Sequence, residues 1–441
     1  MTRLSTRLGT APDPELLDEA ERMSVDELTA LQNRRLVETV AHAYANVPHY
    51  RKALDAAGVS PGDITGVDQI SALPFTGKAE MRENYPFGMF AVPRSEVRRI
   101  HASSGTTGRP VIAGYTDEDL DMWAGVVARS LRAAGVRAGD LVHNAYGYGL
   151  FTGGLGAHDG AERLGCTVVP VSGGMTARQV TLIADLAPDV ICCTPTYLLT
   201  ILDGFADAGI DPRSTSLRIA VLGAEPWTDA MRDDLEERAG LHALNIYGLT
   251  EVIGPGVGCE CIETKDGITI WEDHFYPEIV DPISGDPVPD GELGELVFTS
   301  LTKKAMPVLR YRTRDLTRLL PGTARSMRRI DRISGRTDDM LIVRGVNVFP
   351  TQIEELVVAA PGLSPHFVLE LTRPARMDEL TVRVEAGRGL ADPTSRESVA
   401  TRLSHAIKDR IGVTATVQVV DPATLERSAG KLRRVYDLRE R

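Results

Sequence analysis

The chain has 441 residues, more than one ordinary domain, so we expect two or three domains. Its 43% hydrophobic and 25% charged residues are typical of a globular protein. A net charge of −12 without a long basic stripe argues against nucleic acid or an acidic membrane as a partner. Five cysteines, no apolar leader and no apolar run long enough to span a bilayer predict a location in the reducing cytoplasm.

The first part of the chain predicts helices followed by an alternation of strands and helices. Apolar residues recur at helical spacing before Pro48, and Thr116 with Asp119 predicts the capped start of a helix that buries Trp123. Short apolar runs ending in turn residues then alternate with helical stretches; the predicted strands are LVHNAY, CTVVPV, DVICCTP and RIAVLGAEP. This order predicts an α/β core with a largely parallel sheet, whose ligands bind at the carboxyl ends of the strands.

The pattern changes twice in the second half. After Asp266, hairpins with DG and SGD turns predict a smaller β-rich unit. After Gly335, the strand-like runs MLIVRGVNVF, HFVLEL, LTVRVEA and TATVQVV, with a helical stripe before the last one, predict a compact α+β domain. We therefore expect one domain over residues 1–335 and a second over residues 336–441.

The segment HASSGTTGRP, residues 101–110, is the strongest single motif. Its glycines let successive N–H groups point into one concavity, and its hydroxyls add further donors, which suits a polyphosphate. The Walker A pattern does not occur, which argues against a P-loop NTPase and favours another way of binding ATP.

Four further motifs follow in a fixed order, each weak when taken alone: YGLTE, YRTRD, GRTDD and SAGK. Together with the opening loop and the segments AYGYGLFTGGLGAH, GAEPW and IWEDHFYPEI, they resemble the acyl-adenylate-forming enzymes, and among them the phenylacetate–CoA ligases in particular. The resemblance implies a large N-terminal α/β adenylate-forming domain with a β-rich subdomain, and a small mobile α+β C-terminal domain. It also implies ATP, Mg²⁺ and coenzyme A as cofactors or substrates.

The resemblance also assigns the nucleotide site. The β- and γ-phosphates would lie on Ser103, Ser104, Gly105, Thr106, Thr107 and Gly108. The adenine would lie among Gly223, Ala224, Glu225, Pro226, Tyr247 and Gly248, with the Tyr247 ring stacked on it. Glu251 and Thr106 would hold Mg²⁺, because a hard cation prefers oxygen ligands, and Thr250 would lie near the α-phosphate. Asp315 would accept both ribose hydroxyls, and Arg336 would add a second contact.

The resemblance also assigns roles to residues of the mobile C-terminal domain. Lys431 resembles the lysine that bridges the substrate carboxylate and the α-phosphate during adenylation, where negative charge gathers. The family rotates this domain afterwards, with Asp338 as the hinge. Arg344, Gly345 and Asn347 would then line the channel for the thiol.

The aromatic acid is expected among residues 146–159. Tyr146, Tyr148 and Phe151 offer flat walls, and Gly153 and Gly154 would leave room for a ring, although the same composition also suits plain core packing. Related ligases usually read HYG where this chain has Asp159 between His158 and Gly160. Asp159 either faces the pocket and favours an amino or hydroxyl substituent, or faces solvent and has little effect.

Two other groups of residues are ambiguous. Cys259, Cys261 and His274 have ligand types suited to a structural zinc ion, but their spacing is tight, no fourth ligand is evident, and buried free thiols are the alternative. The arginines between residues 310 and 332 are typical of an ion-paired surface, and we assign most of them no function.

The sequence therefore predicts an ATP- and Mg²⁺-dependent ligase that joins an aromatic acid to coenzyme A through an acyl-AMP. In the alternative, the acyl group passes to a carrier-protein thiol or to an amine. A third possibility, a nucleotide-binding regulator without catalysis, does not explain why Glu251, Asp315 and Lys431 occur together. A homodimer is also expected for this class of enzyme.

Overall fold

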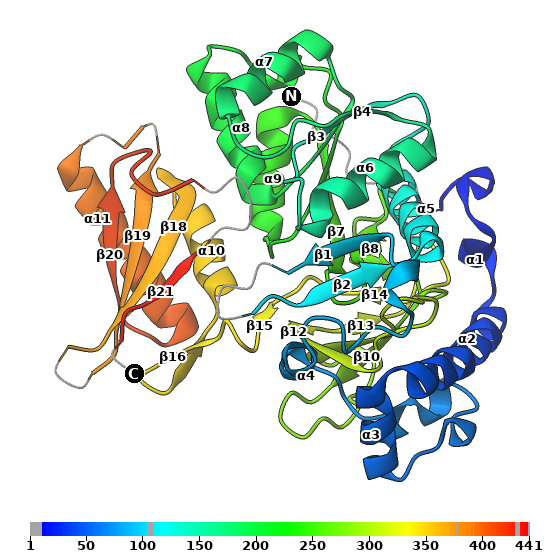
Figure 1. Cartoon of the computed structure of the whole chain (residues 1–441). Coiled ribbons are helices and arrows are strands. Elements are labelled where there is room, and N and C mark those ends of the chain that lie inside the picture. Colours follow the sequence, from blue (N-terminus) through cyan, green and yellow to red (C-terminus); the bar gives the residue numbers. More distant parts are fainter. Residues whose placement is uncertain are drawn as a thin grey trace.

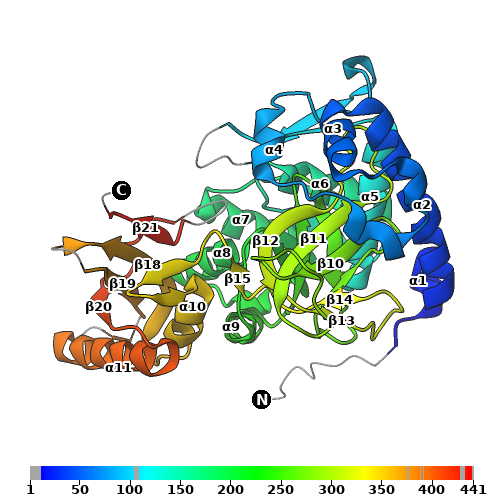
Figure 2. The ribbon, with the colours of Figure 1, turned by 90° about the horizontal axis from the view of Figure 1, so that it is seen from below.

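The computed structural model describes residues 11–103, 109–374, 377–387, 389–390, 392–427 and 433–439. A large part is formed by the chain up to about residue 340, and a smaller part by the residues that follow; the two lie side by side in Figure 1. The helices α2 (Val25–Asn46) and α3 (Pro48–Ala57) lie along the edge farthest from the smaller part, as Figure 2 also shows. Among the described residues, no helix is long and apolar enough to cross a membrane.

A nine-stranded sheet runs through the large part. Its strands in spatial order are β13 (Leu319–Leu320), β14 (Arg329–Ile330), β9 (Ile268–Ile270), β8 (Gly254–Glu260), β7 (His242–Leu249), β6 (Ile219–Gly223), β5 (Val190–Cys193), β3 (Leu141–Asn144) and β4 (Thr167–Val169). The strands from β7 to β4 are parallel, and β8, β9, β14 and β13 add an antiparallel half. The predicted α/β core is confirmed, and the parallel character holds for one half of the sheet.

Helices cover both faces of this sheet because its central strands are apolar on both sides. On one face lie α5 (Asp117–Ala133) and α6 (Thr152–Leu164), and on the other lie α7 (Thr176–Leu186), α8 (Pro195–Asp207) and α9 (Asp229–Ala239). Neighbouring residues of one strand divide between the two cores: Cys192 packs with the first group and Cys193 with the second. The predicted cap is confirmed, since Thr116 Oγ1 accepts from Asp119 N at 3.1 Å.

A second, four-stranded sheet forms the β-rich unit. Its order is β10 (Phe275–Val280), β11 (Gly294–Ser300), β12 (Tyr311–Thr317) and β15 (Gly335–Arg336), and all three pairings are antiparallel. The short helices α1 (Glu19–Arg22) and α4 (Lys78–Glu83) complete the N-terminal region. The domain boundary expected between residues 335 and 336 falls inside β15, and that boundary stays a prediction.

The strands β1 (Arg99–Ala102) and β2 (Ile112–Tyr115) form a separate antiparallel hairpin. The loop predicted to hold phosphates therefore connects the two strands of this hairpin. It does not follow a strand of the parallel sheet, at whose carboxyl ends we expected ligands to bind. Only the segment GAEP follows a parallel strand, β6, as predicted.

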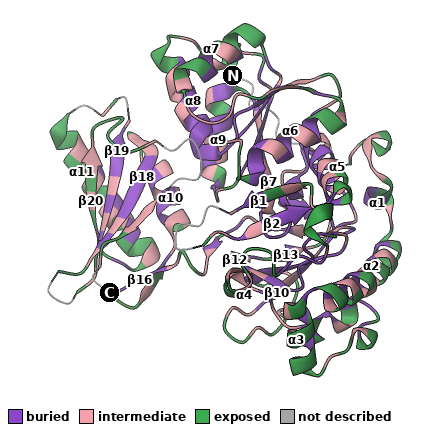
Figure 3. Ribbon diagram, viewed as in Figure 1, coloured by how far each residue is buried: buried purple, intermediate pink, exposed green. Residues whose placement is uncertain are grey.

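The smaller part has the predicted α+β composition. A hairpin of β16 (Leu341–Val343) and β17 (Val346–Val348) leads into α10 (Pro350–Val358) and a sheet that α11 (Pro393–Ile411) packs against. The sheet order is β20 (Ala415–Val420), β19 (Glu379–Ala386), β18 (Leu363–Thr372) and β21 (Val435–Asp437). Figure 3 shows buried residues along β18 and β19 and exposed residues on the outer side of α11.

Candidate active site

The end of β6 and the neighbouring strand β7 supply the residues predicted to surround the adenine. A Cβ at Gly223 would lie 2.3 Å from the carbonyl oxygen of Ile246, and Ala224 has a φ of 70°, so the chain turns sharply at this point. Glu225 accepts hydrogen bonds from Thr196 Oγ1 at 2.7 and 2.8 Å, which fixes its carboxylate. The GAEP turn is thus rigid and lies at the carboxyl end of a parallel strand.

The direction of the Tyr247 side chain depends on a β-bulge in its strand. The register between β7 and β8 shifts between Tyr247 and Gly248, and a Cβ at Gly248 would lie 1.9 Å from the carbonyl oxygen of Gly254. Only glycine fits there, and such bulges redirect the side chains next to them. The Tyr247 hydroxyl donates to Asp315 Oδ2 at 2.5 Å. Burial and the Asp315 carboxylate raise the pKa of Tyr247 well above its usual value.

Asp315, Arg336, Asp338 and Tyr247 form what we call the Asp315 cluster. Asp315 on β12 is paired in register with Arg336 on β15, whose Nη1 donates to Asp315 Oδ1 at 3.0 Å. Arg336 also donates from Nε and Nη2 to the two oxygens of Asp338, at 2.9 and 3.1 Å. Burial acts to raise the pKa of Asp338, but the hydrogen bonds and charge of Arg336 lower it overall. The structure therefore brings together the predicted ribose residues and the predicted hinge residue.

Glu251 follows β7 and is buried beside Thr250. Its Oε1 atom is buried and accepts no hydrogen bond from the described residues. A buried carboxylate oxygen without a donor is costly unless a cation or another donor reaches it. Glu251 thus fits the oxygen ligand that Mg²⁺ requires, whereas Thr106, the other predicted ligand, lies outside the described residues.

Lys303 is a buried residue that the sequence did not reveal. Only 2% of it is exposed, its Nζ lies 3.5 Å from the carbonyl oxygen of Glu251 and 4.9 Å from the centre of the Tyr115 ring. Burial lowers the pKa of Lys303 to about 8, although Asp119 and Glu251 act to raise it. The pair Lys303-Lys304 between two strands is typical of a solvated turn, and no signal in the sequence separates the buried lysine from its neighbour.

Of the predicted phosphate loop, Ser104, Gly105, Thr106, Thr107 and Gly108 lie outside the described residues. The ends of the loop are described. Ser103 Oγ accepts from Val111 N at 3.1 Å, and the buried His101 ring contacts the carbonyl oxygen of Leu150 through Nδ1 at 3.0 Å. The hairpin is thereby tied to the segment expected to bind the acid.

Two of the predicted wall residues are fixed by their hydroxyls. Tyr146 is buried, and its hydroxyl lies 3.4 Å from the carbonyl oxygen of Val221 on β6. The Tyr148 hydroxyl accepts from Asn144 Nδ2 at 2.8 Å and lies 3.1 Å from His158 Nδ1. Burial raises the pKa of Tyr148 to about 12, so the phenol stays neutral at physiological pH. Both rings thus have a fixed position next to the parallel strands.

Two glycines of this segment lie where the chain packs closely. Gly153 and Gly154 lie in the first turn of α6, where added Cβ atoms would lie 2.4 Å from the Phe151 ring and 2.5 Å from the carbonyl oxygen of Gly147. The positions of these two Cβ atoms are therefore filled by the chain itself, and the room for an aromatic ring stays a prediction. Phe151 is 37% exposed and precedes the helix as its N-cap residue.

Asp159 pairs with Arg99 on β1. The Arg99 Nη1 atom lies 2.6 Å from Asp159 Oδ2, and about a quarter of each side chain is exposed. Neither of the two alternatives derived from the sequence included this ion pair, because no pattern in the sequence connects positions 99 and 159.

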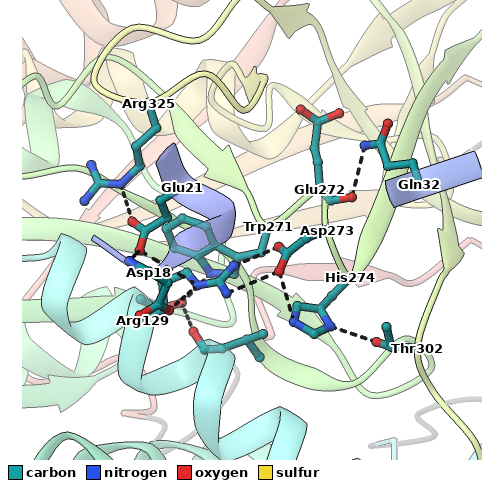
Figure 4. A network of polar contacts seen from close by, with 12 residues as sticks. Asp18, Glu21, Gln32, Arg129, Trp271, Glu272, Asp273, His274, Thr302 and Arg325 are labelled. Carbon is teal, nitrogen blue, oxygen red and sulfur yellow. Dashed lines mark hydrogen bonds and ion pairs between the residues drawn. The ribbon is translucent and has the colours of Figure 1, made fainter. Parts of the chain in front are cut away.

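The proposed zinc ligands do not come together. Among the described residues, no three His, Cys, Asp or Glu side chains are placed to hold a metal ion. Arg325 Nη1 donates to Cys261 Sγ at 2.9 Å, and His274 contacts Asp273 and Thr302. Figure 4 shows that His274 and Arg325 belong to a network of polar contacts around Arg129. Cys259 and Cys261 are buried free thiols, the alternative weighed from the sequence, and burial raises the pKa of each.

We call this network the Arg129 cluster. It contains Asp18, Glu21, Arg129, Asp273, His274 and Arg325. Arg129 donates from Nη1 and Nη2 to the two oxygens of Asp273 at 2.7 and 3.2 Å. The cluster joins α1, α5 and the segment after β9, and so has a structural role.

The predicted thiol-channel residues Arg344, Gly345 and Asn347 lie on the exposed β16–β17 hairpin. Lys431 lies outside the described residues. The two parts of the molecule contact each other elsewhere, through Arg332 and Glu355 at 2.9 Å and through His366 and Asp203 at 3.4 Å.

Comparisons with known proteins show the family to which the chain belongs. The AMP-binding enzyme family matches residues 89–302, and the AMP-binding enzyme C-terminal domain matches residues 345–439. A phenylacetate-coenzyme A ligase of Aromatoleum evansii is 60% identical over 435 residues, which cover 97% of this chain and 98% of that one. A phenylacetate-coenzyme A ligase of Escherichia coli (strain K12) is 58% identical and covers 96% and 98%. This chain belongs to the phenylacetate–CoA ligase family of AMP-binding enzymes.

Two solved structures of a similar ligase differ in their TM-score to this chain. 2-Hydroxyisobutyryl-CoA ligase in the postadenylation state with 2-HIB-AMP has a TM-score of 0.90 and 30% identity, covering 95% of this chain and 91% of that one. The same ligase with 2-HIB-AMP and CoA in the thioesterification state, also 30% identical, has a TM-score of 0.71 and covers 96% and 92%. The arrangement of the two parts in this chain is thus closer to that of the postadenylation state.

Proposed function

We propose that this chain is an ATP- and Mg²⁺-dependent ligase that joins phenylacetate or a substituted aromatic acid to coenzyme A. The observation that carries this function is the similarity to four phenylacetate-coenzyme A ligases, 51–60% identical over 96–97% of the chain. The similarity spans both parts of the molecule.

The first half-reaction forms the acyl adenylate. An oxygen of the acid attacks the α-phosphorus of ATP, the bond to the β-phosphate breaks, and pyrophosphate leaves with that electron pair. Asp315 accepts hydrogen bonds from the ribose hydroxyls, because a carboxylate oxygen can accept more than one hydrogen bond and both oxygens lie where Tyr247 and Arg336 already donate to them. The GAEP turn flanks the adenine, and Tyr247 stacks on it.

Negative charge gathers around the α-phosphorus during this step, and cationic groups must reduce the repulsion. Mg²⁺, when bound, supplies positive charge to the phosphate oxygens, and Glu251 offers it a buried oxygen that has no donor among the described residues. Thr250 orients the α-phosphate, and Thr106 is a second candidate ligand. Lys431 bridges the acid and the α-phosphate.

The second half-reaction transfers the acyl group. The sulfur of coenzyme A attacks the carbonyl carbon of the acyl adenylate, the bond to AMP breaks, and the thiol proton passes to solvent. The C-terminal domain turns about Asp338 between the two steps, so that Lys431 leaves and the hairpin with Gly345 and Asn347 reaches the site. A location in the cytoplasm and a homodimer remain predictions.

The test measures pyrophosphate release and thioester formation by the purified enzyme over a panel of acids, each with and without coenzyme A. The panel contains phenylacetate, hydroxyphenylacetates and aminobenzoates, with a fatty acid of similar size as the control. We expect release with aromatic acids only, and an acyl-CoA of matching mass when coenzyme A is present.

Each outcome decides between the alternatives. Pyrophosphate release without an acyl-CoA product would favour a carrier-protein thiol or an amine as the acceptor. No release with any acid of the panel would favour the nucleotide-binding regulator. Gel filtration of the same preparation reports whether the protein is a dimer.

A further inference from the structure

A buried lysine lies behind the turn that carries Glu251. Lys303 belongs to the connection between β11 and β12, and only 2% of it is exposed. Lysine is rarely buried, because removing an ammonium group from water is costly unless charged or polar groups replace the water. The two half-reactions use Glu251 but leave this lysine without a role. Its place in the interior therefore needs an explanation of its own.

The backbone around Lys303 is fixed by Asp119, which lies on α5. Asp119 Oδ1 accepts from Lys304 N at 2.6 Å, and Asp119 Oδ2 accepts from Ala305 N at 2.8 Å. The carbonyl oxygen of Ala305 accepts from Ala91 N at 2.8 Å. The buried side chain of Lys303 therefore starts from a well-defined position, whereas its neighbour Lys304 is exposed.

Lys303 and Tyr115 together contact the turn that follows β7. Lys303 Nζ lies 3.5 Å from the carbonyl oxygen of Glu251 and 4.9 Å from the centre of the Tyr115 ring. The Tyr115 hydroxyl donates to the carbonyl oxygen of Ile253 at 2.8 Å, and its ring stacks on Trp123. An ammonium group over an aromatic face is attracted by the ring quadrupole. These contacts give Lys303 a fixed place next to the turn.

Lys303 also acts on the Glu251 carboxylate through its charge. Asp119 and Glu251 are two carboxylates that favour the ammonium form of Lys303. Asp119 already accepts hydrogen bonds from three backbone N–H groups. Glu251 is 4% exposed, and its Oε1 atom accepts no hydrogen bond from the described residues. Lys303 is thus a fixed positive charge beside a buried carboxylate that lacks a donor.

A metal ion at Glu251 would meet this charge. Two cations that act on one carboxylate repel each other, so each lowers the affinity of the carboxylate for the other. Pyrophosphate oxygens also bind Mg²⁺, and a Glu251 carboxylate that already has a counter-charge releases the ion to them more easily. A buried lysine at this place therefore favours exchange of the ion over tight binding.

We propose that Lys303 is a positioning residue for the metal site, which compensates the charge of Glu251 and keeps the affinity of Glu251 for Mg²⁺ low enough for release. The proposal rests on the proposed function, because it takes Glu251 as a ligand of Mg²⁺. In the alternative, Lys303 only supports the turn through the carbonyl oxygen of Glu251. The two roles differ in sign: loss of support weakens Mg²⁺ binding, and loss of the counter-charge strengthens it.

The main test follows the thermal midpoint of the wild type, Lys303→Met and Lys304→Met while Mg²⁺ is added to protein saturated with α,β-methylene-ATP. This analogue cannot release pyrophosphate, so the measurement reports binding without reaction. Methionine is a flexible, unbranched side chain without charge. We expect Lys303→Met to reach half of its shift at an about tenfold lower Mg²⁺ concentration, a modest effect for an interior charge. Lys304→Met, the exposed matched control, should follow the wild type.

Thermal unfolding in EDTA tests the pair of charges without the metal. Lys303→Met leaves Glu251 without its counter-charge, so we expect a lower midpoint than in the wild type. The double variant Lys303→Met with Glu251→Gln has no charge at either position and should recover most of this loss. A double variant no more stable than Lys303→Met would overturn the pairing. This comparison also decides the case in which Lys303→Met alone yields too little folded protein for the titration.

The response of the wild type separates this proposal from the proposed function. A wild type whose midpoint does not change with Mg²⁺ would overturn the metal site of the proposed function, and the role of Lys303 with it. A wild type that responds, together with equal or weaker Mg²⁺ binding by Lys303→Met, would overturn the role of Lys303 alone.

Discussion

The Arg129 cluster and the Asp315 cluster both contain paired arginine and aspartate side chains, but they differ in their exposure to solvent. Arg129 and Asp273 are 7% and 3% exposed, and every charged group around them has a partner from another element. In the Asp315 cluster, about half of the Asp338 side chain is exposed, and Arg336 divides its donors between two carboxylates. The Arg129–Asp273 pair at the centre of the first cluster is buried, whereas the Asp338 end of the second cluster borders solvent.

The difference shows which ion pairs can take part in a reaction. A buried ion pair cannot exchange partners without leaving a buried charge unpaired, so it stabilises one structure. A pair at the surface of a cleft can share its atoms with a ligand, because water or the ligand replaces the lost contact. Substitutions in the first cluster should therefore change stability, and substitutions in the second should change kinetics.

The largest effect is expected for Asp273→Asn. This variant removes the charge that faces Arg129 and His274 in the interior, and losing one partner of a buried pair costs about 3–5 kcal/mol. Denaturant unfolding measures the free energy change. The matched control is Asp121→Asn, which breaks a surface pair with Arg163 at 2.5 Å and should cost less than about 1 kcal/mol.

The pH dependence of the unfolding free energy tests whether Asp273 is ionised in the folded state. Burial acts to raise the pKa of Asp273, but His274 and Arg129 lower it overall, so the folded state favours the ionised form. The stability that this carboxylate contributes is complete above its unfolded pKa of about 4, and is lost as the pH falls through the lower folded value. We expect the wild type to lose stability more steeply than Asp273→Asn between about pH 5 and pH 2. Parallel curves would contradict the ionised pair.

The next effect is kinetic, for Lys431→Ala. Removing a cation that faces charge developing in the transition state lowers the adenylation rate about 10²–10³-fold. Thioester formation from added acyl-AMP should continue near the wild-type rate, because the lysine is absent from that step. Single-turnover assays of the two half-reactions measure both rates, with Lys408→Ala at the end of α11 as the control. An equal loss in both half-reactions would contradict the domain rotation.

A smaller effect is expected for Asp315→Asn. The variant removes a charged acceptor from the ribose, so the KM for ATP should rise about tenfold. Arg336 keeps its two bonds to Asp338, and no charge is stranded, so the loss of stability should be far smaller than for Asp273→Asn. Measuring KM and the unfolding free energy of both variants tests the contrast between the clusters directly. A larger stability loss for Asp315→Asn would reverse it.

The sequence predicted the elements but not the long-range pairs. The strands from β3 to β6 and the cap at Thr116 follow from local periodicity, which is why they were found. Helix α6 lies between the first two predicted strands, where the alternation predicts a helical stretch, although Gly153 and Gly154 lower the helix propensity of its first turn. The burial of Lys303 and the hydrogen bond from Arg325 to Cys261 depend on contacts between residues more than 50 positions apart in the sequence. No local pattern encodes such contacts.

Asp159→Asn should have the smallest effect of all. Its pair with Arg99 is partly exposed, and such pairs contribute about 0–1 kcal/mol. Because Arg99 holds the carboxylate, we expect the relative kcat/KM values for phenylacetate and its hydroxyl and amino derivatives to stay the same. The panel of acids used for the wild type measures these ratios, with Asp121→Asn as the control. A shift in favour of phenylacetate would mean that Asp159 leaves Arg99 and contacts the ring substituent, and the Arg99–Asp159 pair would then belong with the open clusters.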